Sequence, residues 1–153
     1  MYVPIDLTLT RPMPTKAANS VTPTAAPTAA PRTAKGFWYL GSPYSKYPLG
    51  LEQAFREVCR CAAVFVREGI PVYSPIAHTH PIAMEGRLDP LDHTIWLAFD
   101  APMMAAAEGL IVCEMQGWQE SEGLKKEIEF FESRDRPVTF FDPVLQRILP
   151  GWR

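Results

Sequence analysis

The sequence has few of the features that mark a special cellular environment. Among its 153 residues are only three cysteines, which form neither a CxxC zinc pattern nor an even-numbered disulfide set. It also lacks a run of about 20 apolar residues, which a membrane span needs. Its N-terminus has neither the basic start nor the apolar core of a secretory signal. We therefore expect a cytoplasmic protein with reduced thiols and no membrane partner.

A strong net charge and the commonest nucleotide-binding motifs are missing as well. The formal net charge is -2, so the chain has no basic surplus for binding nucleic acid. The sequence contains no P-loop, no GxGxxG and no GxSxG motif. We expect no cofactor, and a small molecule rather than a nucleic acid as the partner.

What is present divides into two parts of different composition. Residues 1–35 hold seven Thr, seven Ala and six of the sixteen Pro, with no Phe or Trp. This composition favours extended chain and cannot bury a core, so it predicts a disordered or extended tail. Within it, Tyr2–Leu9 alternates apolar and polar residues and could add a strand to a partner's sheet. Residues 36–153 are predicted to form one α/β domain.

Within this domain, segments of strand character alternate with segments of helical periodicity. The expected strands are Phe37–Leu40, Ile70–Ser74, Gly109–Met115 and Pro137–Phe141. The expected helices are Gly50–Glu68, Pro90–Phe99, Pro102–Ala107, Ser121–Ser133 and a short Val144–Leu149, with Ala77–Pro81 in a long loop. The alternation predicts a flavodoxin-like or Rossmann-like open parallel sheet of four to five strands flanked by helices.

One acidic residue interrupts an apolar helix face. Leu124, Ile128 and Phe131 form an i, i+4, i+7 stripe, and Glu127 lies within it. Because helical side chains lean toward the N-terminus, this carboxylate is expected near the carboxyl edge of the sheet, where ligands bind in such folds. The alternative is a rim residue that interacts with the helix dipole.

Three other residues near that edge have two interpretations each. Ser121 and Gly123 form either an ordinary helix start or a turn whose free amides hold a phosphate. Asp100 is either the N-cap of the helix that starts at Pro102, which its spacing favours, or an acid at the sheet edge.

His78 and His80 flank Thr79 in the expected loop. An HxH pair ligates zinc only when further ligands join it, and no Cys, His or acidic residue follows at a convincing interval. We expect these histidines to contact a substrate or cap backbone, with no metal bound.

Over Trp38–Pro143 these residues resemble the nucleoside 2-deoxyribosyltransferase superfamily, which includes 2'-deoxynucleoside 5'-phosphate N-hydrolases and a little-characterised phage and bacterial branch. The motifs that carry the resemblance are Tyr39-Leu40-Gly41-Ser42-Pro43-Tyr44, Asp100 eight residues before Glu108, and Ser121-Glu122-Gly123-Leu124-Lys125-Lys126-Glu127. By resemblance, Glu127 is the nucleophile and Asp100 assists the departing base. Two features differ from the best-known members. One is the Gly117-Trp118 pair, and the other is Glu108, at a position where many members carry aspartate.

The resemblance also implies a function and an assembly. The expected reaction is cleavage of the N-glycosidic bond of a (deoxy)nucleoside or nucleoside 5'-monophosphate, with hydrolysis favoured over base transfer. The expected assembly is a homodimer or higher homo-oligomer, which an exposed Trp118 would allow. The predicted substrate-binding residues are Tyr39, Gly41, Ser42, Tyr44, His78, His80, Trp118, Ser121 and Gly123. The alternatives are a non-catalytic nucleotide or sugar-phosphate sensor tethered by its tail, and an assembly protein in which the tail is the functional part.

Overall fold

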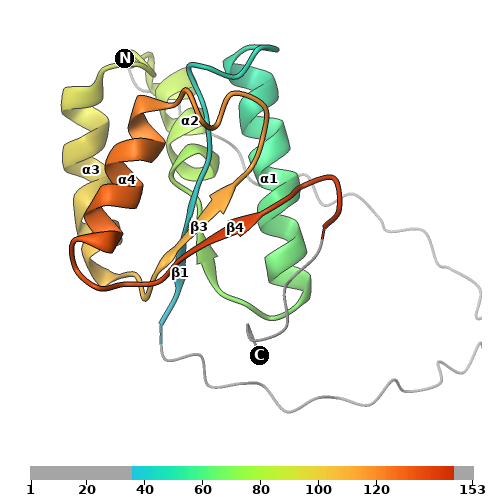
Figure 1. Cartoon of the computed structure of the whole chain (residues 1–153). Coiled ribbons are helices and arrows are strands. Elements are labelled where there is room, and N and C mark those ends of the chain that lie inside the picture. The colour runs from blue at the N-terminus through green and yellow to red at the C-terminus, as the bar shows by residue number, and fades with distance from the viewer. Residues whose placement is uncertain (1–35, 147–153) are drawn as a thin grey trace, which may run out of the picture. The chain divides into compact units, whose positions relative to one another are not determined.

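The computed structural model describes residues 36–146, which contain a four-stranded, all-parallel sheet (Figure 1). The strands are β1 (Trp38–Gly41), β2 (Val72–Tyr73), β3 (Leu110–Cys113) and β4 (Val138–Phe141), in the order β2-β1-β3-β4. The two central strands, β1 and β3, are almost completely buried, whereas the edge strands are shorter or partly exposed. The predicted open parallel α/β sheet is confirmed.

Four helices connect and flank these strands: α1 (Leu51–Arg67), α2 (Pro75–Gly86), α3 (His93–Ala106) and α4 (Glu122–Glu132). In Figure 1, α3 and α4 lie on one side of the sheet and α1 on the other. Two apolar clusters match this division. One joins α1 and the start of α2 to Leu40, Ile111 and Phe141, and the other joins α3 and α4 to Tyr39 and Val112.

The first long helix begins and ends where its sequence predicts. α1 follows Gly50, and Glu68 is its C-cap. Gly69 then adopts a positive φ of 70°, and the amides of Gly69 and Ile70 donate to the carbonyls of Val66 and Phe65. This double hydrogen bond after a left-handed glycine is the Schellman motif. The predicted glycine stop is confirmed.

The expected loop around His78 and His80 is instead the helix α2, so that prediction is wrong. Pro75 ends β2, as expected, but it also occupies the first turn of α2, where its missing N–H costs nothing. The side chain of Ser74 accepts a hydrogen bond from the Ala77 amide at 3.3 Å and caps the helix. Pro81 removes a single interior hydrogen bond, and the helix continues through it.

The predicted break at Asp100 is also wrong, because α3 continues through it from His93 to Ala106. The helix starts at a different cap, where the side chain of Asp92 accepts from the Thr94 amide at 2.9 Å. Pro102 lies inside the helix rather than at the start of a new one. Asp100 is therefore a buried residue of a helix interior and not an N-cap.

The remaining expectations concern the chain ends and the membrane. The predicted tail, residues 1–35, lies outside the described residues. Of the expected helix Val144–Leu149, the described part, residues 144–146, is a turn closed by Asp142, whose side chain accepts from the Val144 amide at 2.7 Å. Within residues 36–146, no helix is long and apolar enough to cross a membrane.

Removal of the cap of α2 should weaken the fold measurably. Ser74→Ala takes away the acceptor of the Ala77 amide, so we expect the free energy of unfolding to fall by about 1 kcal/mol. Ser74→Asp, which keeps an acceptor, should retain most of the stability. Urea titration measures both, with Ser45→Ala in an exposed turn as the control. Equal stability of Ser74→Ala and Ser45→Ala would contradict the cap.

Candidate active site

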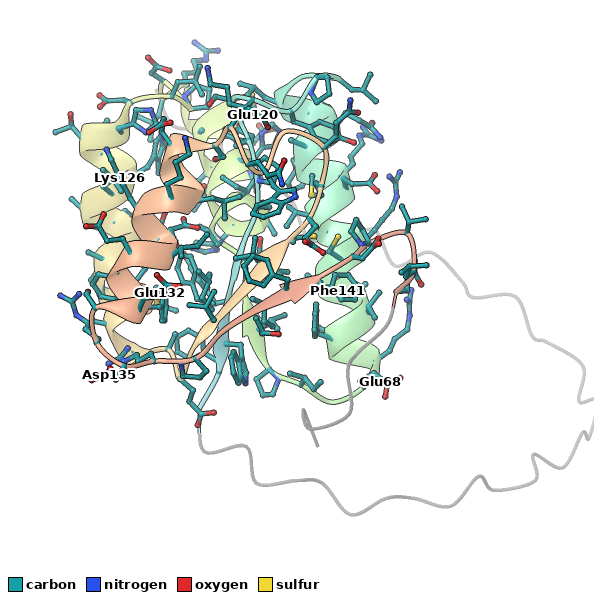
Figure 2. The ribbon with its side chains drawn as sticks, viewed as in Figure 1. Glu68, Glu120, Lys126, Glu132, Asp135 and Phe141 are labelled. Carbon is teal, nitrogen blue, oxygen red and sulfur yellow. The ribbon has the colours of Figure 1, made fainter. Side chains whose placement is uncertain are left out.

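Two carboxylates from the flanking helices α3 and α4 face the sheet on the same side. Glu127 comes from the second turn of α4 and Asp100 from the middle of α3. Other charged residues of α4 lie on its exposed surface, as Lys126 and Glu132 do in Figure 2. Glu127 thus turns toward β1, the direction that the apolar stripe around it indicates.

The Glu127 carboxylate is held at one oxygen and unpartnered at the other. The hydroxyl of Tyr39 on β1 donates to Oε1 at 3.3 Å. Oε2 is fully buried and has no hydrogen-bond partner among the described residues. It lies against Gly41, where a Cβ atom would come within 2.5 Å of it. A glycine at the end of β1 is therefore what lets the carboxylate approach the strand.

This environment favours the protonated form of Glu127. Burial raises the pKa of the carboxyl group to about 8; the negative charge of Asp100 adds to the rise, and the hydrogen bond from Tyr39 opposes it. A buried acid with one unpaired oxygen destabilises the fold when it ionises. Such an arrangement is typical of functional sites, where stability is given up for reactivity.

Asp100 has a parallel arrangement with a second tyrosine. The hydroxyl of Tyr73 on β2 donates to its Oδ1 at 3.0 Å. Burial raises the pKa of Asp100, while the Tyr73 hydrogen bond and the nearby His78 oppose the rise. Tyr39 and Tyr73 are register partners on neighbouring strands, with ring centroids 5.8 Å apart. The site therefore contains two tyrosine–carboxylate pairs side by side.

Sequence reasoning did not identify Tyr73. The signal was available in its position: it is the last residue of the second strand, in register with Tyr39, so both side chains point to the same face of the sheet. Burial and the charge of Asp100 raise the pKa of the Tyr73 hydroxyl. It stays a hydrogen-bond donor to Asp100 at neutral pH.

The structure separates the two predicted histidines. Because they are two positions apart on a helix, their side chains are related by a rotation of roughly 200° about its axis and point in nearly opposite directions. His78 is exposed, stacks on Phe99 at 5.8 Å and lies beside Tyr73, near Asp100. His80 is buried on the α1 side, in a separate hydrogen-bonded chain with Tyr44. Within residues 36–146, no three His, Cys, Asp or Glu side chains come together as metal ligands.

The start of α4 keeps both of its sequence interpretations. The Ser121 side chain caps the helix by accepting from the Leu124 amide at 3.4 Å. Around Gly123, an added Cβ would meet only the Ser121 side chain, at 3.9 Å, so packing does not demand a glycine there. In the first loop, the Ser42 hydroxyl is buried without a hydrogen-bond partner in the described part of the chain.

A cleft of about 650 Å³ opens between the loop after β1 and the start of α4, and neither Glu127 nor Asp100 lines it. Glu120, which lines it, lies at the opposite end of the domain from Glu68 and Asp135 in Figure 2. The lining residues are Lys46, Pro48, Gln116, Gly117, Gln119, Glu120, Glu122 and Lys125. Sequence reasoning missed the two lysines, which look like ordinary surface residues in the sequence.

Trp118 does not line this cleft. It is half-buried, not exposed as expected, and packs against Phe140 with ring centroids 5.6 Å apart. Its indole therefore supports the core between β4 and the β3–α4 loop.

The fold and this geometry define an open α/β domain with a buried carboxylate pair at one face of its sheet. Residues 36–143 match the family described as a domain of unknown function (DUF1937), and the chain belongs to that family. A search of curated proteins found no match.

Neutralising the buried acid should stabilise the protein in a pH-dependent way. Because the folded-state pKa of Glu127 is raised to about 8, its contribution to stability is present below the ordinary value of 4.5 and is lost as the pH rises through 8. The free energy of unfolding of Glu127→Gln, measured relative to that of the native protein, should therefore rise by roughly 2 to 4 kcal/mol from pH 5 to pH 9. Urea titrations at both pH values measure this gain, with the exposed Glu129→Gln as the control. An equal effect of Glu127→Gln at the two pH values would show that Glu127 is not a buried acid.

Proposed function

We propose that this domain cleaves the N-glycosidic bond of a (deoxy)nucleoside or nucleoside 5'-monophosphate, with hydrolysis favoured over base transfer. The proposal assigns Glu127 as the nucleophile and Asp100 as the acid that assists the departing base. The observation that carries it is the buried Oε2 of Glu127, which no described residue hydrogen-bonds and which has a second carboxylate as its electrostatic neighbour. The likeness of the SxGxxxE motif to the nucleoside 2-deoxyribosyltransferase superfamily supports the same assignment.

The proposed reaction has two steps. The ionised Glu127 attacks the anomeric carbon, the bond to the base breaks, and Asp100 gives a proton to the base. Water then attacks the sugar ester and restores Glu127, while Asp100 takes a proton from that water. Tyr39 holds Oε1 at 3.3 Å and so fixes the orientation of the attacking oxygen. Transfer differs only in that a second base replaces the water.

The raised pKa of Glu127 fits this chemistry. Oε2 of Glu127 has no hydrogen bond to a described residue that would have to be broken, and the positive charge that develops on the sugar ring stabilises the ionised form of the carboxylate. The raised pKa of Glu127 also lets the carboxyl pair retain a proton near neutral pH, which the departing base needs.

The direct test is a chromatographic screen of the common nucleosides and nucleoside monophosphates for release of free base. We expect release by the native chain and a loss of at least about 10³-fold in Glu127→Ala, because no other group supplies the nucleophile. Glu129→Ala, which removes an exposed carboxylate from the same helix, should release base at the native rate. Undiminished turnover in Glu127→Ala would sink the mechanism.

The pH dependence should report Glu127. With an aryl deoxyriboside whose leaving group needs no proton, kcat/KM should rise with pH through about 8 as Glu127 ionises. The negative charge of Asp100 raises the pKa of Glu127, so Asp100→Asn should move this rising limb to lower pH. Initial rates from pH 5 to pH 10 measure both profiles. A rate that falls as Glu127 ionises would instead make it the acid.

A non-catalytic nucleotide or sugar-phosphate sensor is the second candidate. Two features favour it. Burial favours the protonated form of Glu127, and Lys46, which suits a phosphate, lines the cleft at the start of α4, where Lys125 is paired with Glu122 at 2.6 Å. A sensor would bind members of the same panel without releasing base. Equilibrium binding with no turnover, unaffected by Glu127→Gln, would decide for it.

A further inference from the structure

Two buried thiols meet inside the apolar cluster on the α1 side of the sheet. Cys61 is a buried residue of α1, and Cys113 is the last residue of the central strand β3. Both cysteines are free, they are 2% and 0% exposed, and Sγ of Cys113 donates to Sγ of Cys61 at 2.8 Å. Glu127 and Asp100 belong to α4 and α3, on the other side of the sheet in Figure 1, so the proposed reaction uses neither thiol.

The two sulfur atoms are close enough to form a bond without a rearrangement of the fold. A disulfide has an S–S length of about 2.05 Å, so a bond between Cys61 and Cys113 needs a displacement of less than about 1 Å. The two residues are 52 positions apart in the chain and lie in different elements. A disulfide here would therefore join α1 to the central strand through the core.

Cys61 is the member of the pair that a small molecule can reach. It lines a cavity of about 50 Å³ between α1 and the turn after β4, and Cys113 does not. The other lining residues are Glu57, Arg60, Val64, Phe141, Pro143 and Gln146. Because Arg60 and Gln146 are exposed, the cavity lies at the surface of the domain. Its volume admits a few water-sized molecules, which suits a small oxidant and excludes a large one.

The environment of Cys113 makes it the second of the two thiols to react. The hydrogen bond to Cys61 and burial raise the pKa of the Cys113 thiol, so it keeps its proton at neutral pH. A protonated thiol is a poor nucleophile toward an oxidant, and Cys113 is also enclosed by the core. Its sulfur is nevertheless in contact with Cys61 and can attack that residue once it is oxidised.

We propose that Cys61 and Cys113 form an oxidation site, at which a small hydroperoxide that enters the cavity converts the two thiols into a disulfide. With hydrogen peroxide, the Cys61 thiol gives up its proton, its sulfur attacks one peroxide oxygen, and the O–O bond breaks. Cys61 becomes a sulfenic acid, and the second oxygen leaves with that proton as water.

The second step forms the disulfide. The sulfur of Cys113 attacks the sulfur of Cys61, the S–O bond breaks, and the hydroxyl group leaves with the Cys113 proton as a second water. Together the two thiols lose two electrons, which reduce one hydrogen peroxide to two waters. A dithiol reductant reverses the modification by exchange.

Peptide mapping of the full native chain tests the site directly. Trypsin cleaves after Arg60, so it places Cys59 and Cys61 in different peptides. After treatment with hydrogen peroxide and alkylation of the remaining thiols, mass spectrometry should find peptide 61–67 joined to peptide 88–125, two hydrogens lighter than their sum. Dithiothreitol should separate the two peptides again.

The half-buried Cys59 supplies the matched control, because it lies on the same helix and does not line the cavity. Cys59→Ser should form the same link as the native chain. A native chain without the link between Cys61 and Cys113, or one in which Cys59 takes the place of Cys61, overturns the proposal. This map needs no variant of either buried thiol, so it decides even where such a variant does not fold.

The order of the two steps is tested with a 1,3-diketone probe, which labels sulfenic acids. In Cys113→Ala the oxidised Cys61 has no thiol to react with, so its labelling by the probe should rise at least about tenfold over the native chain. Cys61→Ser should leave Cys113 unlabelled, because its thiol does not line the cavity. Circular dichroism checks the fold of both variants. Equal labelling of Cys113 in Cys61→Ser and of Cys61 in Cys113→Ala would reject the assigned order.

The route through the cavity is tested by the size of the oxidant. The link between Cys61 and Cys113 should form at least about tenfold more slowly with tert-butyl hydroperoxide than with hydrogen peroxide, when each rate is divided by that of Cys59 oxidation in the same sample. This ratio removes the difference in intrinsic reactivity between the two oxidants. Equal ratios would exclude the cavity as the route to Cys61.

Discussion

The approach of the Glu127 carboxylate to the end of β1 is the constraint on which the rest of the site depends. It needs a glycine at position 41, because any side chain there would overlap Oε2. It also needs Tyr39 at the centre of the sheet, where one phenol both fills the core and holds Oε1. The same residues that bury the acid therefore orient it, so the stability and the chemistry of this site cannot be changed independently.

The position of Asp100 relative to Glu127 depends on the pairing of two neighbouring strands. Its partner Tyr73 is the register neighbour of Tyr39, so the parallel pairing of β1 and β2 sets the spacing of the two tyrosine–carboxylate pairs. α3 and α4 need only present one carboxylate each to the same sheet face. The electrostatic coupling between the acids then follows from the topology, because helices that cover one face bring their inward side chains together.

The sequence predicts the sheet and the inward position of Glu127 because both depend on periodicity. A continuous apolar strand such as Leu110–Cys113 is clear from the sequence, and the apolar stripe around Glu127 indicates an inward position, with a rim residue as the alternative. The prolines mislead, because Pro75 ends a strand and begins a helix, and Pro102 lies inside a helix that packing keeps continuous. The loop assigned to His78 and His80 failed for this reason. The hydrogen bonds of Tyr73 and His80 could not be predicted, because they join residues 27 to 36 positions apart.

The lengths of the strands give the two carboxylates unequal support. Tyr39 belongs to the central strand β1, which pairs on both sides, whereas Tyr73 ends β2, a two-residue strand at the edge of the sheet. Edge pairing this short opens more readily than a central strand, so amide protons around Tyr73 should exchange with solvent faster than those around Tyr39. The hydrogen-bond partner of Asp100 is therefore held less firmly than that of Glu127. The β2 side of the site is therefore expected to be more flexible than the β1 side.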